Sequence, residues 1–117
     1  MAQKPPKWLQ KQKMKLYIDT SDGEKITVGI DGEKFETEAR KDKSQKLLPF
    51  IDELLKKKGK KIKDITEIEI NTGPGSYTGL RVGVSVANAI GWALDIPVNG
   101  KDLKKGEGVE IEYESKE

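Results

Sequence analysis

The feature that most constrains the fold is a glycine-rich turn that leads directly into a long apolar segment, "NTGPGSYTGLRVGVS", from Asn71 to Ser85. The spacing predicts a helix over Thr78–Leu94, in which Gly79, Gly83, Ala87 and Gly91 recur every four residues. These four residues form one line along the helix, the small-residue stripe. Each glycine costs about 1 kcal/mol relative to alanine inside a helix. Tertiary packing must compensate, so we expect another part of the backbone, or a partner, to approach this stripe closely.

The same helix is apolar around most of its circumference. Ile90 shares one face with Val82, Val86, Ala89 and Ala93, while Leu80, Val84 and Leu94 widen the apolar arc. A helix that is apolar on most sides needs two packing partners. One is the predicted sheet. The other is either the first helix of the chain or a second protein, and the sequence leaves both open.

The first forty residues predict an antiparallel meander. Strand-forming segments cover Met14–Thr20, Lys25–Ile30 and Lys34–Glu38, and the Asp-Gly pairs at 22–23 and 31–32 are typical hairpin turns between them.

A helix is predicted next from Leu47, Leu48, Phe50, Ile51, Leu54 and Leu55, which fall in one stripe. Ser44 is the expected N-cap and Gly59 the expected stop. Pro49 should lie in the first turn or kink the helix.

A fourth strand at Ile65–Asn71 and a short fifth at Ile96–Val98 flank the glycine-rich segment. The order β-β-β-α-β-α-β predicts an α/β fold with a mixed sheet and helices packed on it. This is the topology of a single ribonuclease H-like, or actin-like ATPase, half-domain. We assign residues 14–100 to this domain, 1–13 to a flexible basic arm, and 101–117 to a polar, acidic tail. Within the tail, Val109–Tyr113 is either a short edge strand or disordered.

Composition narrows the chemistry. With no cysteine and no histidine, the chain has no thiolate nucleophile, no imidazole base and no His/Cys zinc site. Net charge is only +2, yet lysines cluster at positions 4–15 and 56–63, which keeps a basic RNA-binding module as one alternative. No apolar leader or membrane-length stretch is present, and we expect a cytoplasmic protein.

The glycine-rich turn is also a candidate anion site. It is neither a Walker A loop nor a dinucleotide fingerprint, because no Gly-Lys-Ser/Thr follows and Thr78 stands where the third glycine belongs. Amides at a helix start can still bind an anion. The candidate nucleotide-binding loops comprise Asp19, Thr20, Thr72, Gly73, Gly75, Ser76, Thr78 and Arg81. A small actin-like nucleotide-binding domain is therefore a further alternative, although tight packing is the commoner role of such a turn.

Three segments carry a family resemblance: "YIDTSDGEKITVGI", "KLLPFIDELLKKKG" and "ITEIEINTGPGSYTGLRVGVSVANAIGWALDIPVNG". In this order and spacing they closely resemble the N-terminal domain of the TsaB family, over roughly residues 14–100. Two departures stand out. Typical members have a second lobe of similar size, and a histidine often precedes the LLP motif, where this chain reads Ser44-Gln45-Lys46.

The resemblance implies an actin-like fold and a non-catalytic subunit for making threonylcarbamoyladenosine in tRNA. Its partners would be a TsaD-type catalytic subunit and a TsaE-type ATPase, with tRNA reached through the complex and a homodimer as a related assembly. It implies no catalytic residue and no metal site, and ATP with magnesium only within the complex. The implied partner interface lies on the two helices, at Leu47, Leu48, Ile51, Leu54, Leu55, Gly79, Leu80, Gly83, Val84, Ala87 and Gly91.

Overall fold

The computed structural model describes residues 12–106 and 108–111, so nearly all of the predicted N-terminal arm lies outside the described residues. The elements are β1 (Lys15–Asp19), β2 (Lys25–Ile30), β3 (Glu33–Glu38), α1 (Lys43–Lys57), β4 (Glu67–Ile70) and α2 (Tyr77–Leu94). Two short 3-10 helices, η2 (Ile62–Asp64) and η3 (Leu103–Lys105), follow α1 and α2.

The strands form one mixed sheet in the order β3-β2-β1-β4. The pairs β1–β2 and β2–β3 are antiparallel, and β1–β4 is parallel. The Asp-Gly turn between β2 and β3 places Asp31 at φ 50° and Gly32 at φ 90°, the left-handed conformation that a two-residue hairpin needs. The predicted meander and the predicted α/β architecture are confirmed.

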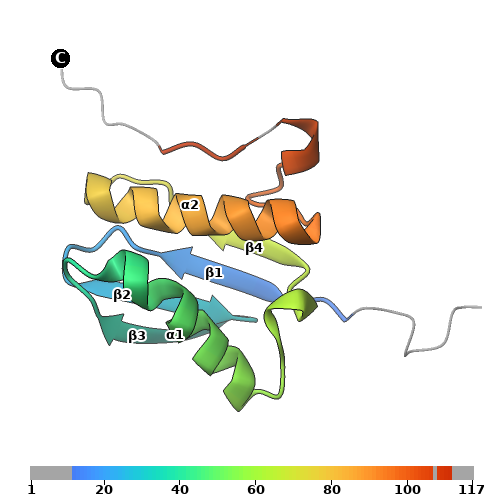
Figure 1. The fold of residues 1–117 in the computed structure, drawn as a ribbon, viewed down its shortest axis with the longest axis horizontal. Coiled ribbons are helices and arrows are strands. Elements are labelled where there is room, and N and C mark those ends of the chain that lie inside the picture. The colour runs from blue at the N-terminus through green and yellow to red at the C-terminus, as the bar shows by residue number, and fades with distance from the viewer. Residues whose placement is uncertain (1–11, 107, 112–117) are drawn as a thin grey trace, which may run out of the picture.

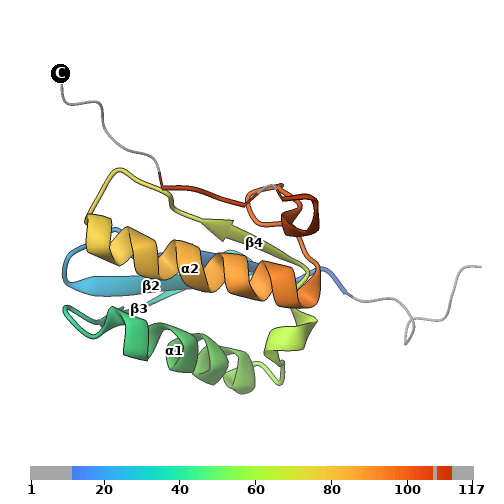
Figure 2. The ribbon, with the colours of Figure 1, turned by 45° about the horizontal axis from the view of Figure 1, so that its top comes forward.

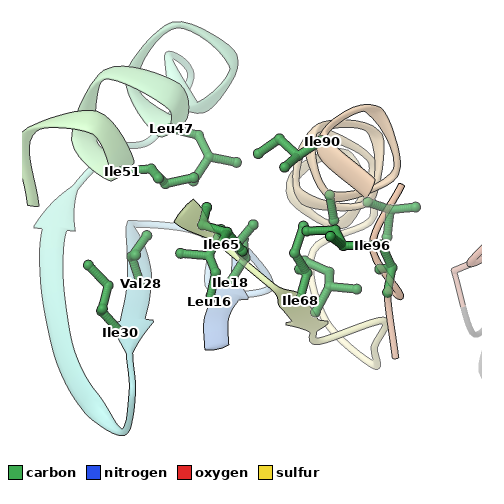
Figure 3. Close-up of a cluster of buried hydrophobic side chains, with 14 of the residues drawn as sticks. Leu16, Ile18, Val28, Ile30, Leu47, Ile51, Ile65, Ile68, Ile90 and Ile96 are labelled. Carbon is green, nitrogen blue, oxygen red and sulfur yellow. The ribbon is translucent and has the colours of Figure 1, made fainter. Parts of the chain in front are cut away.

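Both helices cover the same face of the sheet (Figures 1 and 2). The core lies between them and the strands (Figure 3), where Leu16 and Ile18 of β1 lie on the side of Leu47 and Ile51 of α1, and Ile68 of β4 lies under α2. Period-two alternation sends the neighbouring side chains to the opposite face. That face is polar, and on it the Lys34 ammonium lies 4.6 Å from the centroid of the Tyr17 ring.

The start of α1 differs from the prediction. The helix begins at Lys43, with Asp42 rather than Ser44 at the N-cap position, and the Asp42 side chain makes no capping hydrogen bond. Instead, the Asp42 carbonyl accepts hydrogen bonds from the amides of Gln45 and Lys46. Pro49 consequently lies in the second turn. The stop is as expected, because Gly59 directly follows the cap residue Lys58 and has φ 69°.

The predicted fifth strand is reduced to isolated bridges, in which Val98 pairs with Ile68 of β4 and with Lys101. The side-chain amide of Asn99 explains why pairing stops there. It donates to the Ile70 carbonyl at 3.1 Å and accepts from the Ile70 amide at 2.9 Å, so it occupies the groups that a longer strand would use.

Within the tail, residues 108–111 are not a strand and do not join the sheet. They lie against α2 instead. The Asn88 side chain donates to the Val109 carbonyl at 3.0 Å and accepts from the Val109 amide at 3.3 Å. Val109 is 6% exposed and belongs to the core. Tyr113 lies outside the described residues.

Candidate functional site

Two loops meet where β1 and β4 end, as expected for neighbouring parallel strands. The Asp19 carboxylate accepts from the Ser21 amide at 2.9 Å and from the Ser21 hydroxyl at 2.6 Å. Asn71 links the loops, since its side chain donates to the Ser21 hydroxyl at 3.2 Å and accepts from the Gly73 amide at 3.0 Å. The Ser76 amide also donates to the Ser21 carbonyl at 2.8 Å. The loops therefore bond mainly to each other.

This environment keeps Asp19 ionised. Partial burial acts to raise its pKa, but hydrogen bonds from the Ser21 hydroxyl and amide and from Asn71 outweigh burial, and the pKa lies below its ordinary value. The loop after β1, which carries Asp19, and the glycine-rich turn therefore face each other.

The glycines of this region accommodate close packing within the chain. A Cβ added to Gly75 would lie 2.6 Å from the Ser21 Cβ, and one added to Gly79 would lie 2.2 Å from the Thr20 carbonyl oxygen. Thr20 is fully buried, and its hydroxyl donates to the Gly79 carbonyl at 2.6 Å. The close backbone approach that the small-residue stripe predicted is therefore made by the loop after β1.

The stripe continues against the sheet. A Cβ on Gly83 would lie 2.4 Å from the Thr20 hydroxyl oxygen, and one on Gly91 would lie 2.5 Å from a Val98 methyl carbon. Of the helix residues that the resemblance assigned to a partner interface, all but Leu48 are buried in the chain's own core. Close approach by another part of the same chain thus accounts for the glycines of the stripe. Docking of a partner on the helices stays a prediction.

A different set of residues forms the outer surface of the two helices. Leu48 is 42% and Tyr77 48% exposed, and Val82 and Val86 are half-buried. An open groove of about 380 Å³ between α2 and the start of α1 is lined by Ser44, Tyr77, Thr78, Arg81, Val82, Ser85 and Val86. The signal for this surface was present in the sequence, because Val82 and Val86 belong to the wide apolar arc predicted for this helix.

Arg81 and Thr78 therefore lie at this groove. The Arg81 guanidinium is 5.7 Å from the centroid of the Tyr77 ring. Thr72 and Gly73 lie in the glycine-rich turn with Gly75, and Ser76 caps α2 by accepting from the Gly79 amide at 3.2 Å. Within the described ranges, no three acidic side chains gather in a way that could hold a metal ion. No helix among these residues has the length and apolar character needed to cross a membrane.

The sheet order, the two helices on one face and the glycine-rich turn between β4 and α2 define one lobe of the actin-like, ribonuclease H-like class. The solved structure of YeaZ from Pseudomonas aeruginosa is similar to this chain, with a TM-score of 0.63 and 27% sequence identity over 74% of this chain and 42% of that one. A family model described as "TsaD: tRNA N6-adenosine threonylcarbamoyltransferase" matches residues 36–100.

Relatives named TsaB, "tRNA threonylcarbamoyladenosine biosynthesis protein", match about half of this chain. The Bacillus subtilis protein is 38% identical over 63 residues, or 54% of this chain and 28% of that protein. The Escherichia coli protein is 32% identical over 57 residues, 49% of this chain and 25% of that protein. A tRNA N6-adenosine threonylcarbamoyltransferase from Nitrosospira multiformis is 40% identical over 62 residues, 53% of this chain and 18% of that enzyme.

The chain therefore belongs to the family that the TsaD model describes, and within it the chain is similar to proteins named TsaB. The matches to the Bacillus subtilis and Escherichia coli proteins span about a quarter of the length of each.

Proposed function

We propose that this chain is a non-catalytic partner subunit in the synthesis of threonylcarbamoyladenosine in tRNA. In this proposal it docks on a TsaD-type catalytic subunit through the outer surface of α1 and α2, and a TsaE-type ATPase joins the assembly. The TsaB relatives support the pathway, since their name describes that biosynthesis. The cytoplasm is the compartment that this role implies.

The observation that carries the proposal is the apolar outer surface of the helix pair. Val82 and Val86 lie one helical turn apart at the rim of the groove, and Leu48 and Tyr77 are large apolar side chains exposed on the same helices. Exposed aromatic and aliphatic side chains around a groove are typical anchors of a protein interface. A second copy of this chain presents the same helix pair, so the same surface also favours a homodimer when the partner is absent.

The test is the mass in solution, by light scattering, of the chain alone and after mixing with a TsaD-type subunit. We expect a stable complex, which Val86→Asp should abolish because it places a carboxylate in the apolar contact. Thr27→Asp is the matched control, since Thr27 is also half-buried but lies in β2, away from both helices. A complex that survives Val86→Asp would refute docking on this surface.

A nucleotide-binding role has support from one place only, the meeting of the ionised Asp19 with the glycine-rich turn. Because the loop groups bond to each other, we expect the chain alone to bind no ATP, and ATP with magnesium to bind, if at all, after assembly. Calorimetry at millimolar ATP measures this directly. Saturable binding by the isolated chain, weakened by Asp19→Ala, would favour the nucleotide-binding alternative.

A further inference from the structure

We infer that the end of the molecule opposite the glycine-rich turn binds RNA, with lysines on the phosphates and the Trp92 indole against an unpaired base. This inference deepens the proposed function, on which the choice of tRNA as the RNA rests. The surface itself is formed by segments that the fold brings together.

Three separate segments of the sequence gather at this end (Figures 1 and 2). The strands β1 and β4 are parallel and begin here, and both helices return toward it. Met14, just before β1, is tied to Thr66, just after η2, since its amide donates to the Thr66 hydroxyl at 2.7 Å and its carbonyl accepts from the Thr66 amide at 2.9 Å. The bridge from Val98 to Ile68 holds the segment before η3 beside β4.

Lysines dominate the side chains presented there, and we call this surface the lysine-rich end. It comprises Lys57, Lys60, Lys61 and Lys63 around η2 and Lys101 and Lys105 around η3. Within residues 12–106 and 108–111, none of these six ammonium groups forms an ion pair.

Three of the nearby carboxylates are already engaged. Asp64 accepts from the Lys61 amide at 2.8 Å, Asp31 accepts from the Lys15 amide at 2.9 Å, and Glu33 pairs with Lys58 at 2.5 Å. Carboxylates that accept hydrogen bonds from amides or pair with other lysines compete less for the six ammonium groups. Lysines spread over a surface, without a shaped pocket, suit the repeating phosphates of a nucleic acid, which they contact without regard to sequence.

An aromatic platform accompanies the lysines. Trp92, in the last turn of α2, is 54% exposed, and the Lys104 ammonium lies 4.4 Å from the centroid of its ring. Basic side chains next to an exposed aromatic ring are how proteins hold unpaired bases, which stack on the ring. The combination favours RNA with loops over a regular DNA duplex or an acidic protein. The sequence analysis did not predict this combination, because Trp92 lies far in sequence from both lysine clusters.

The experiment is a titration of fluorescently labelled, unmodified tRNA with the full chain, followed by anisotropy over a series of potassium chloride concentrations. The test variant combines Lys57→Gln, Lys61→Gln and Lys63→Gln. The control variant combines Lys25→Gln, Lys41→Gln and Lys46→Gln, which removes the same charge from the start of β2 and of α1. Both variants should melt at the wild-type temperature, since exposed lysines contribute little stability.

We expect the test variant to bind roughly tenfold or more weakly and to reduce the slope of log affinity against log salt by about 2, with the control variant unchanged. Trp92→Ala should weaken binding roughly tenfold while leaving the salt slope intact, because stacking releases no counterions. Equal losses in test and control variants would overturn the inference, as would competition by polyglutamate or duplex DNA as strong as that by tRNA.

The same variants, mixed with a TsaD-type subunit, separate this inference from the proposed function. The charge variants should assemble normally, because the lysine-rich end lies away from the groove. Loss of RNA binding with an intact complex supports the inference. Normal RNA binding by a chain that never assembles would refute the proposed function and leave the RNA surface standing.

Discussion

The two ends of the sheet differ in how far their polar groups are engaged. At the carboxyl ends of β1 and β4, the groups of Asp19, Ser21 and Asn71 bond to one another, and glycines bring the backbone into contact with the loop. At the opposite end, six lysines lack an ion pair among the described residues and Trp92 is more than half exposed.

The difference shows that a conspicuous motif can serve packing while an inconspicuous surface stays open to ligands. The glycine-rich turn resembles an anion site in sequence, yet its glycines make room for Thr20 and Ser21. The lysine-rich end has no motif, because its six lysines come from two separate parts of the chain, around η2 and around η3. Substitutions should therefore affect folding strongly at the first end and weakly at the second.

The largest effect is expected from Gly79→Ala. Alanine is the better helix former by about 1 kcal/mol, so on an exposed face this change would stabilise the protein. Here the new Cβ would lie 2.2 Å from the Thr20 carbonyl oxygen. We expect the free energy of unfolding, measured by urea denaturation, to fall by about 3 kcal/mol.

Gly23→Ala is the control for this substitution, because a Cβ at Gly23 would meet nothing within 4 Å. Its free energy of unfolding should match wild type within about 0.5 kcal/mol. A Gly79→Ala protein as stable as this control would show that the loop after β1 yields easily and that the engaged end is not rigidly packed.

Local patterns predicted much of the fold, because the Asp31-Gly32 turn and the alternating strands are determined by neighbours in sequence. The second helix was expected at Thr78–Leu94 and is found at Tyr77–Leu94. Ser44 was wrong as the N-cap, since a cap residue three positions before an apolar stripe cannot be distinguished from one five positions before it by residue type alone.

The candidate site was harder to predict than the fold. The small-residue stripe correctly indicated close approach, but spacing alone cannot say whether the approaching backbone belongs to the same chain. Thr20 and Gly79 are 59 residues apart in sequence, so reasoning from local patterns could not pair them. The contact of Asn88 with Val109 and the position of Trp92 beside Lys104 likewise depend on how the tail returns along α2.

The second prediction concerns that tail, which connects the two regions. The tail leaves the lysine-rich end at η3 and reaches the side of α2. There Glu110 and Ile111 line, together with Arg81, a second groove that is distinct from the one between α2 and α1. Asn88→Ala removes both hydrogen bonds to the Val109 backbone. We expect a loss of about 2 kcal/mol in the free energy of unfolding, because a largely buried peptide group loses its partner.

Limited trypsin digestion checks the same change locally. Cleavage after Lys104 and Lys105 should become faster in Asn88→Ala, while Ser85→Ala, an exposed change one turn earlier, should leave the rate unchanged. If cleavage and stability matched wild type in both variants, the tail would contribute nothing to the core.

A smaller effect is expected from Thr20→Val, which keeps the shape of the side chain but removes the hydrogen bond to the Gly79 carbonyl. We expect a loss of about 1 kcal/mol, since this is a single buried hydrogen bond and the shape is retained. Thr27→Val in β2, on the open face of the sheet, is the control and should be nearly neutral. A neutral Thr20→Val would mean that packing against the glycines alone holds the loop on α2.

The smallest effect should come from the charge of Asp19, and it should depend on pH. Its pKa is lowered in the folded protein from the ordinary 3.8, so the unfolded chain takes up the proton first. The carboxylate therefore stabilises the fold above pH 3.8, and this contribution disappears as the pH falls below that value. Asp19→Asn should cost less than about 1 kcal/mol at neutral pH, because solvent screens a partly exposed carboxylate. Melting temperatures of the two proteins should converge as the pH falls below 3.8 and through the lowered pKa of the folded state, where wild-type Asp19 becomes neutral as well. A difference that stayed constant with pH would assign the role of Asp19 to the geometry of its hydrogen bonds, and the ionised carboxylate would no longer distinguish this end of the sheet from the other.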